Sequence, residues 1–433
     1  MKHAPMKHCY AHSDQAIDLC RAWLAGDPPW QLDRFLAQAM KEDRRLGRRD
    51  RQALSEAVFA VTRFASLARA VLTLAARGAL PDDCADLPAL RELPLDRTLA
   101  IVIARYGREA WPLRGIDKYS LGEKLGLAFS EIAARAEHEL PYFLAWHGID
   151  PAWEPVLRAR AIASGWDEAV LREFVAQQDT RPPMWLRLNR PEKREQVLNE
   201  LSVDYDVDYE GDALAVIGPR GIYDLKCWQE GDIEIQDFAS QQVGHAMAPK
   251  PGETVWDACA GGGGKTLQLA ALMKGRGAVH ASDIRVKMLD EVARRAKRAG
   301  FHNVRTFAWQ GEVPPELPRE TQKRGGYDAV LVDAPCTASG TWRRNPDARY
   351  RYASLGDRSL LALQLRLLSV AAQVVRPGGR LVYGTCSIRV EENEDVVAGF
   401  LAAHPGFTLV RQGIHGCPQR DADAMFVALM TRS

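Results

Sequence analysis

Hydrophobic residues in the first part of the chain recur at the spacing of an α-helix. Leu19, Trp23 and Leu24 lie on one helical face, and the apolar residues of 32–40 and 54–64 repeat the same three- and four-residue spacing. The pattern continues to about residue 180, and it predicts an all-helical domain over residues 1–180.

The pattern changes at Arg181, which two prolines follow. Residues 185–189 predict a short strand, residues 192–201 predict a helix, and further strands follow with a turn at 219–221. Because proline and glycine mark the edges of this stretch, we expect a separate small α+β module over residues 181–235.

From residue 236 onward, short apolar runs alternate with amphipathic segments of helical length. The predicted strands are 253–260, 277–283, 303–309, 327–336, 378–387 and 425–430, and the predicted helices are 261–275, 286–300, 359–376 and 391–405. Such alternation is typical of a doubly wound parallel sheet, so we expect a Rossmann-like α/β domain over residues 236–433.

Composition limits the function classes. The chain has 433 residues and a net charge of +1, so any nucleic-acid surface must come from local clustering of charge. The eight cysteines include no CxxC pair; we therefore predict neither a zinc site nor a disulfide framework, and we expect a reducing, cytoplasmic compartment. The first twenty residues lack the apolar run of a secretory signal, and no stretch reaches the roughly 18 apolar residues of a membrane span.

Two segments concentrate arginine and are candidates for nucleic-acid contact. In the first, residues 41–51, five arginines stand beside three acidic residues, so a solvated charged face is the commoner explanation. In the second, residues 342–351, arginines alternate with Trp342 and Tyr350, which suits phosphate contact and base stacking. A surface loop anchored by Trp342 is the alternative for the second segment, and we favour the nucleic-acid interpretation.

A glycine-rich turn at residues 257–266 follows a predicted strand and opens a predicted helix. Its four glycines allow a ligand to approach the backbone N–H groups, although a tight structural turn is the alternative. The turn is not a P-loop, because that motif would need glycine where Cys259 stands. Asp283 ends the next strand, where a carboxylate suits a pair of ribose hydroxyls; the alternative role is to cap the following helix.

Two cysteines follow neighbouring predicted strands. Cys336 lies in Asp-Ala-Pro-Cys after Asp333, and Cys386 lies in Thr-Cys-Ser. Since ligands bind at the carboxyl ends of strands in open α/β sheets, we expect both thiols at the rim beside the glycine-rich turn. Buried cysteines are often inert, but two at adjacent strand ends, each flanked by polar residues, favour chemistry. Lys265 could lower the pKa of a nearby thiol or hold Asp333 in place.

With these segments in view, the chain resembles the Fmu/Sun family of RNA cytosine-C5 methyltransferases. The matching segments are IQDFASQQ (235–242), DACAGGGGKT (257–266), ASDI (281–284), DAPCTASGTWRRNPDARY (333–350), RPGGRLVYGTCS (376–387) and EENEDVV (391–397). The resemblance implies a class I methyltransferase domain that uses S-adenosyl-L-methionine. It implies cofactor contacts from Cys259, Ala260, Gly261, Gly262, Gly263, Gly264, Lys265, Asp283 and Asp333.

The resemblance also implies how the cysteines divide the work. Cys386 is the nucleophile that attacks C6 of the cytosine, and Cys336 assists release of the methylated RNA. A thiolate is needed because C5 of cytosine is a poor nucleophile until attack at C6 breaks the aromaticity. Asp333 stabilises the adduct near N3 and N4 of the ring, with Lys265 as the fourth catalytic residue.

Further expectations concern RNA. The segment 32–63 is similar to the NusB-like helical region of the bacterial ribosomal RNA members, and residues 181–235 are similar to the family's RNA-binding insert. The resemblance therefore implies an RNA partner, with small-subunit ribosomal RNA as the first expectation, and a monomer is the default oligomeric state.

The chain departs from the family at two places. Gly262 stands where the family usually has proline, so we expect a more flexible turn. The third strand ends in FAWQGE (307–312), without the aspartate that usually contacts the adenine amine. Trp309 could stack on the adenine instead, although a core position is the more usual one for tryptophan.

Three alternatives stay open. The RNA could be a transfer RNA, or the protein could be a catalytically silent RNA-binding ribosome-assembly factor. The third alternative, a DNA cytosine-C5 methyltransferase, would use the cysteine of the Pro-Cys dipeptide as its nucleophile and would not need Cys386.

Overall fold

The computed structural model describes residues 10–26, 31–43, 45–218, 221–351 and 358–433. The chain forms two compact units, Met1–Arg181 with Thr341–Gly356 and Pro182–Gly340 with Asp357–Ser433. Arg44 of the first arginine segment and part of the predicted turn at 219–221 lie outside the described residues.

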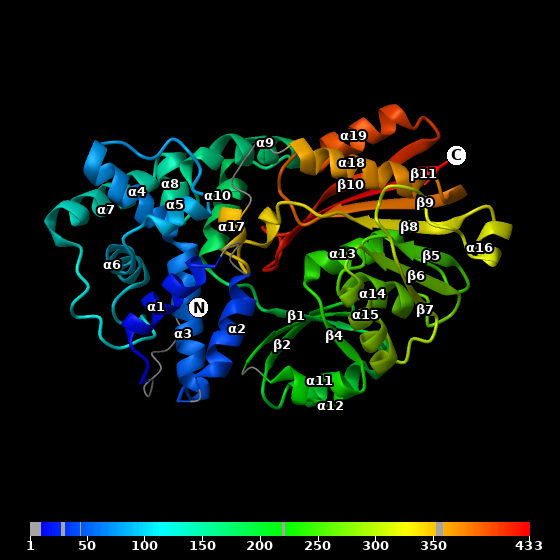
Figure 1. Ribbon diagram of the computed structural model, residues 1–433, viewed down its shortest axis with the longest axis horizontal. Coiled ribbons are helices and arrows are strands. Elements are labelled where there is room, and N and C mark those ends of the chain that lie inside the picture. The colour runs from blue at the N-terminus through cyan, green and yellow to red at the C-terminus, as the bar shows by residue number, and fades with distance from the viewer. Residues whose placement is uncertain (1–9, 27–30, 44, 219–220, 352–357) are drawn as a thin grey trace. The chain divides into compact units, whose positions relative to one another are not determined.

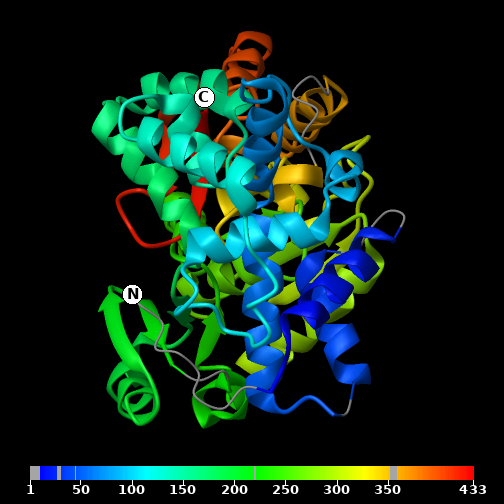
Figure 2. The same ribbon diagram turned by 90° about the vertical axis from the view of Figure 1, so that its left-hand side faces the viewer.

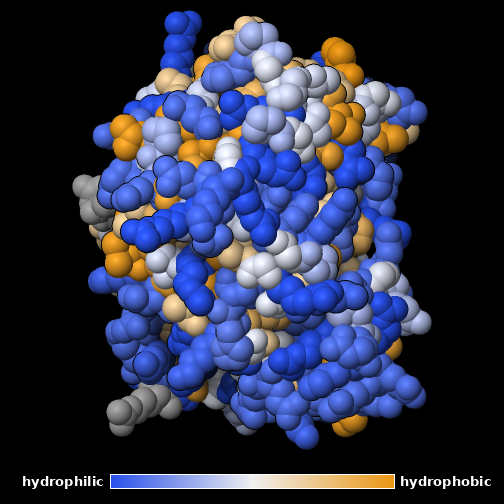
Figure 3. Space-filling model, turned by 90° about the vertical axis from the view of Figure 1, so that its right-hand side faces the viewer, coloured by the Kyte–Doolittle hydropathy of each residue, from blue (hydrophilic) through white to orange (hydrophobic). Residues whose placement is uncertain are grey.

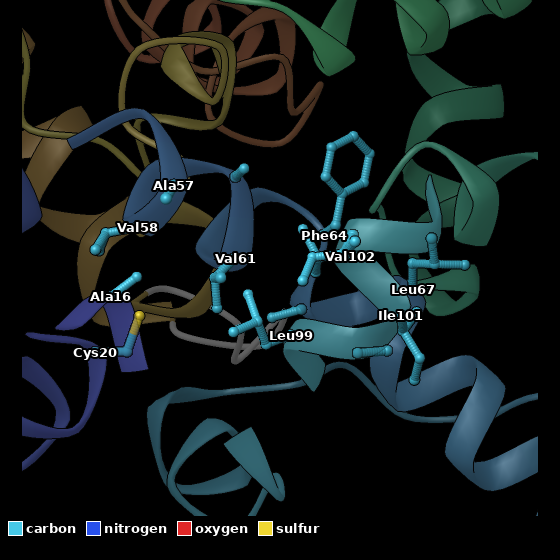
Figure 4. Close-up of a cluster of buried hydrophobic side chains, with 14 of the residues drawn as sticks. Ala16, Cys20, Ala57, Val58, Val61, Phe64, Leu67, Leu99, Ile101 and Val102 are labelled. Carbon is cyan, nitrogen blue, oxygen red and sulfur yellow. The ribbon is translucent and has the colours of Figure 1, made fainter. Parts of the chain in front are cut away.

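The N-terminal unit is helical, as its hydrophobic spacing predicts (Figures 1 and 2). Its helices are α1 (Ser13–Leu24), α2 (Leu32–Glu42), α3 (Arg48–Arg63), α4 (Ala65–Arg77), α5 (Leu87–Arg91), α6 (Leu95–Tyr106), α7 (Gly122–Ala136), α8 (Leu140–Trp146), α9 (Glu154–Ser164), α10 (Glu168–Ala176) and the short α17 (Ala348–Arg351). Helices α3, α4 and α6 carry the centre of the core, where Val58, Leu67 and Leu99 are fully buried (Figure 4).

The small module is built on an antiparallel sheet with strand order β2-β3-β1-β4. Its elements are β1 (Met184–Leu188), α11 (Arg194–Leu201), β2 (Asp206–Glu210), β3 (Ala213–Ile217), α12 (Lys226–Gln229) and β4 (Ile233–Ile235). Leu186, Val197 and Leu214 pack between the sheet and α11 and are fully buried. The module belongs to the same compact unit as the large sheet.

The large sheet has the strand order β10-β11-β9-β8-β5-β6-β7 (Figure 1). Its strands are β5 (Thr254–Asp257), β6 (Ala278–Asp283), β7 (Val304–Ala308), β8 (Tyr327–Asp333), β9 (Val375–Thr385), β10 (Phe407–Gly416) and β11 (Ala424–Arg432). Strands β7, β6, β5, β8 and β9 pair in parallel, whereas β11 and β10 are antiparallel additions at one edge. Strand β10 was not among the predicted strands.

Helices cover both faces of this sheet, which confirms the doubly wound Rossmann-like fold (Figure 1). On one face, α13 (Phe238–Met247) and α14 (Gly264–Leu272) pack against apolar residues such as Val255 and Leu331. On the other face, α18 (Arg358–Ala372) and α19 (Glu394–Ala403) pack against their strand neighbours, such as Trp256 and Val330. Consecutive strand residues point to opposite faces, and both faces are buried.

The chain order creates a switch point beside the central strand β5. After β5 the chain proceeds through β6 and β7 on one side, and then it crosses to β8 and β9 on the other. The loops that follow β5 and β8 therefore run apart at the carboxyl ends of the strands, which is where ligands bind in open α/β sheets.

Among the described residues, no single helix is long and apolar enough to cross a membrane; α3 and α4 reach that length and composition only together, across a bend of 48°. The face of the molecule in Figure 3 is covered mainly by hydrophilic side chains, with hydrophobic ones in small groups between them.

The arginine-rich segment 342–351 is not a surface loop. It belongs to the helical unit, where the side chains of Trp342, Arg343, Arg349 and Tyr350 are all buried. The rings of Trp342 and Trp153 meet edge to face with centroids 4.7 Å apart. The prediction that these residues contact phosphates and stack on bases is therefore wrong, because their polar atoms are directed into the protein.

The guanidinium of Arg349 serves as an internal hydrogen-bond donor. It donates to the backbone carbonyls of Arg63 at 2.8 Å and Gly148 at 2.5 Å. Arg63 in turn donates to the carbonyl of Arg343 at 2.9 Å. Burial and then the nearby charge of Arg349 lower the pKa of Arg63 to about 10. Gly148 permits this close approach, since a Cβ there would lie 2.3 Å from the Arg63 carbonyl oxygen.

We expect Arg349→Ala to lower the free energy of unfolding by about 2–4 kcal/mol, because it leaves two buried carbonyl groups without donors. Urea denaturation followed by circular dichroism measures the change. Arg45→Ala is the control: its side chain is 88% exposed, so a change within about 0.5 kcal/mol is expected. Unchanged stability together with weaker RNA binding in Arg349→Ala would restore the surface interpretation.

Candidate active site

The glycine-rich turn is held against the ends of two neighbouring strands. The N–H of Ala260 donates to the carbonyl of Ser282 at 2.8 Å, and the N–H of Gly263 donates back to Ala260 at 2.9 Å. Gly263 has φ +85°, and a Cβ there would lie 3.0 Å from Val292. Only glycine meets both demands, so the turn can pack closely against α15 (Val286–Ala299), the helix that carries Val292.

Asp283 connects the end of β6 to this turn. Its Oδ2 accepts the N–H of Gly261 at 2.9 Å, and its Oδ1 accepts the backbone N–H of Arg285 at 2.9 Å. Burial acts to raise the pKa of Asp283, but hydrogen bonds and charge from Arg285 outweigh it and lower that pKa. Arg285 itself is the N-cap residue of α15 (Val286–Ala299), so the capping alternative for Asp283 is not realised directly.

Lys265 and Asp333 form an ion pair. The Nζ of Lys265, at the start of α14, lies 2.7 Å from Oδ2 of Asp333, at the end of β8. Burial acts to lower the pKa of Lys265, but the charge and hydrogen bond of Asp333 raise it overall, with a contribution from Cys386. The sequence offered two roles for this lysine, and its geometry favours holding Asp333 in place.

Asp257 lies beneath the turn and is fully buried. It accepts the hydroxyl of Thr266 at 2.6 Å, while its second oxygen has no hydrogen-bond partner among the described residues. Burial raises its pKa to about 7. The thiol of Cys259, the second residue after Asp257, packs against the apolar cluster beneath α18, and burial raises its pKa.

The thiols of the two predicted catalytic cysteines are in contact. The Sγ atoms of Cys336, after β8, and Cys386, after β9, lie 3.3 Å apart, and both thiols are free. The hydrogen bond with Cys386 and then burial raise the pKa of Cys336 well above its usual value. Either sulfur can donate in this contact, and the raised pKa of Cys336 favours the protonated thiol at the more buried of the two cysteines.

Glu392 holds the two cysteine loops together, a role that the sequence pattern did not predict. Its side chain is fully buried in the segment before α19. It accepts the backbone N–H of Thr337 at 2.9 Å and the Thr337 hydroxyl at 2.6 Å, and it accepts the Ser387 hydroxyl at 2.9 Å. Since Thr337 follows Cys336 and Ser387 follows Cys386, one carboxyl group fixes both loops.

The neighbouring residues complete this network. Gln364 of α18 donates to Glu392 at 3.0 Å, and the Asn393 amide donates to the carbonyl of Ser387 at 2.9 Å. Gly340 donates its N–H to the carbonyl of Cys386 at 2.8 Å, and a Cβ at Gly340 would lie 2.1 Å from the Ala424 carbonyl oxygen. The only sequence signal for this network was that Glu392 and Asn393 lie within EENEDVV, a segment shared with the family.

Trp309, the residue that follows β7, is buried in the core. Its ring is buried edge to face against Trp256 with centroids 4.9 Å apart, and its indole N–H donates to the carbonyl of Val313 at 2.8 Å. Trp309 is therefore a core residue, and the alternative in which it stacks on adenine is wrong.

The fold and the site define a class: a Rossmann-like methyltransferase domain with a pair of thiols at neighbouring strand ends. Residues 244–430 match the family model described as 16S rRNA methyltransferase RsmB/F. Through these residues the chain resembles the RsmB/F family, which confirms the predicted Fmu/Sun resemblance.

Named relatives agree with the family match. The chain is 33% identical over 293 residues to ribosomal RNA small subunit methyltransferase B of Klebsiella pneumoniae, covering 66% of this chain and 64% of the relative. It is 31% identical over 265 residues to the protein of the same name in Shewanella oneidensis, covering 58% of this chain and 57% of the relative. The chain thus spans less than two thirds of the length of these curated relatives.

The fold also matches a solved structure. The crystal structure of PH0851 is similar with a TM-score of 0.69 and 25% identity, covering 98% of this chain and 100% of that chain.

We expect Glu392→Ala to lower the free energy of unfolding by about 3–5 kcal/mol, because it leaves several buried donors without an acceptor. It should also release the two loops, so that iodoacetamide alkylates Cys386 at a changed rate. Glu391→Ala is the matched control, since the Glu391 side chain is 44% exposed and should change stability by less than about 0.5 kcal/mol. Equal stability and equal alkylation rates in the two variants would show that Glu392 does not hold the loops.

Proposed function

We propose that this protein transfers a methyl group from S-adenosylmethionine to C5 of a cytosine in RNA. The observation that carries the proposal is the pair of free thiols, Cys336 and Cys386, with sulfur atoms 3.3 Å apart. Two cysteines at adjacent strand ends, with the Lys265–Asp333 ion pair on the same rim, suit a reaction in which one thiol adds to a base and another group assists its release.

The glycine-rich turn fits the cofactor. A Cβ at Gly264 would meet nothing within 4 Å, and at Gly261 only the tip of Arg285, so the turn is open to a ligand at these two glycines. Arg285, which pairs with Asp283, has a side chain that is 64% exposed, so it can leave Asp283 without becoming a buried unpaired charge. Asp283 would then accept the ribose hydroxyls, and Asp333 would face the reacting end. When bound, S-adenosylmethionine supplies the methyl group as an electrophilic sulfonium.

The thiols and the aspartate divide the chemistry. Cys386, as the thiolate, adds to C6 of the cytosine, and the electron pair moves to C5, which becomes nucleophilic enough to accept the methyl group. Asp333 accepts a hydrogen bond from the N4 amino group as the carboxylate, or, once it has taken up a proton, donates that proton to N3; either contact stabilises the ring charge in the adduct. Removal of the C5 proton by a base then breaks the C6–sulfur bond and regenerates Cys386.

Cys336 assists this last step. Its raised pKa keeps it as a thiol beside Cys386. A group that exchanges a proton next to the departing sulfur lowers the barrier to elimination, which is the family's role for this cysteine. The DNA methyltransferase alternative assigns the nucleophile to Cys336, and the more buried position and raised pKa of that thiol argue against it.

Small-subunit ribosomal RNA is the proposed substrate, because the family model and the relatives carry that name. Arg45, Arg48 and Arg49 are exposed at the start of the helical unit's α3 and the turn before it, where they could contact phosphate. Transfer RNA stays the second candidate, and a silent assembly factor is the candidate from another class.

The decisive experiment is methyl transfer from labelled S-adenosylmethionine to RNA from cells that lack this gene. We expect wild type to form 5-methylcytosine in one RNA species and Cys386→Ala to lose at least about 10³-fold in rate, since the nucleophile is gone. Cys336→Ala should trap a covalent protein–RNA adduct that survives denaturing gel electrophoresis.

Cys84→Ala is the control, because Cys84 belongs to the helical unit and should leave activity unchanged. Activity retained in Cys386→Ala but lost in Cys336→Ala would favour the DNA-type mechanism. No transfer by wild type, together with no cofactor binding in calorimetry, would favour the silent assembly factor.

A further inference from the structure

Two arginines hold the glycine-rich turn from outside the predicted cofactor site. A guanidinium nitrogen of Arg295, on α15, donates to the carbonyl of Gly262. Arg187, on β1 of the small module, donates to the carbonyl of Gly264 at 2.9 Å. The family usually has proline at the position of Gly262, and the ring of proline would fix the backbone angle φ there. In this chain the hydrogen bond from Arg295 restrains the same backbone instead.

Both arginines are in turn held by the small module. Glu234 of β4 is fully buried, and its Oε2 lies 2.8 Å from Nη2 of Arg295, while its other oxygen pairs with Arg298. Arg187 is also buried, and it donates to Asn189 at 2.6 Å and to Gln236. Each guanidinium therefore spans from the module to one carbonyl of the turn.

The module also fixes the helix that carries Arg295. Gly231 lies so close to the end of α15 that a Cβ there would be 2.5 Å from the Cα of Ala299. Arg190 donates to the Ala299 carbonyl at 3.0 Å, and the Arg298 guanidinium lies 3.9 Å above the Trp228 ring. These contacts leave α15 little freedom relative to β4, so the position of Arg295 is determined by the module.

The charge of the module also argues for such a role. Residues 181–235 carry seven lysines and arginines against twelve aspartates and glutamates. Its edge strand β2 is acidic, with Asp206, Asp208 and Glu210 exposed. An excess of negative charge opposes phosphate binding. The buried Arg187 instead donates to the turn, and the buried Glu234 pairs with Arg295, which also donates to it.

We propose that Arg295 and Arg187 are positioning residues for the glycine-rich turn (257–266). The small module (181–235) holds these two arginines in place, and we call this arrangement the brace. The proposal rests on the proposed function, because it assumes that the turn binds S-adenosylmethionine. Carbonyls fixed by arginine direct the N–H groups of the same turn toward the ligand, and a turn ordered in advance loses less conformational freedom on binding.

Calorimetric titration of the full-length protein with S-adenosylhomocysteine tests the brace. We expect Arg295→Ala to raise Kd about tenfold or more. Arg294→Ala is the matched control, since Arg294 is the preceding residue of α15, is 65% exposed and pairs only with Glu291 among the described residues; its Kd should equal that of wild type. The double variant Arg295→Ala with Gly262→Pro should recover most of the lost affinity, because the ring restrains the same backbone.

A second substitution keeps the test independent of folding. Arg295→Lys keeps a positive charge beside Glu234, but one ammonium replaces the planar fork that serves two partners, so Kd should again rise severalfold. The brace proposal is wrong, while the proposed function stands, in either of two cases. In the first, folded Arg295→Lys or Arg295→Ala binds S-adenosylhomocysteine with the Kd of wild type. In the second, adding Gly262→Pro to Arg295→Ala restores none of the lost affinity. If wild type itself does not bind S-adenosylhomocysteine, the proposed function fails first.

Discussion

The buried carboxyl group of Glu392 is the contact on which the geometry of the candidate active site depends. The loops after β8 and β9 each deliver one cysteine, and neither loop alone determines where its sulfur lies. Thr337 and Ser387, the residues that follow the cysteines, both donate to this one side chain. An acidic side chain can be buried here only because its oxygens accept several hydrogen bonds. The donors belong to the two cysteine loops, so the same hydrogen bonds hold those loops in position.

Much of the fold could be predicted because it follows from periodic patterns. The helix that ends before Gly300 was evident from the apolar spacing and from a glycine that adopts φ +74° in the structure. Strand β10 was missed because it is an exposed edge strand whose apolar residues are few and partly solvent-accessible. Strand β4 was missed because three residues are too short to show an alternation.

The candidate site could be predicted in part. Asp283 and Asp333 end parallel strands, and Cys336 and Cys386 follow parallel strands; the sheet brings such positions to one rim. Glu392 could not be recognised, since an acidic residue at the start of a predicted helix is normally solvated. The segment 342–351 was misassigned for a related reason: arginines interleaved with aromatics have the same composition whether they contact RNA or the carbonyls of their own protein. The partners of Arg349 come from residues 63 and 148, far away in sequence, and only the tertiary structure identifies them.

The inserted segment 341–356 has a consequence for the order in which the protein is made. The helical unit is not complete when its first 181 residues leave the ribosome, because two of its buried side chains, Trp342 and Tyr350, have not yet been translated. At roughly 5–20 residues per second, the delay is on the order of ten seconds. During that time the newly made helices expose apolar surface, so the N-terminal half depends for its final packing on a strand-to-helix connection of the catalytic half.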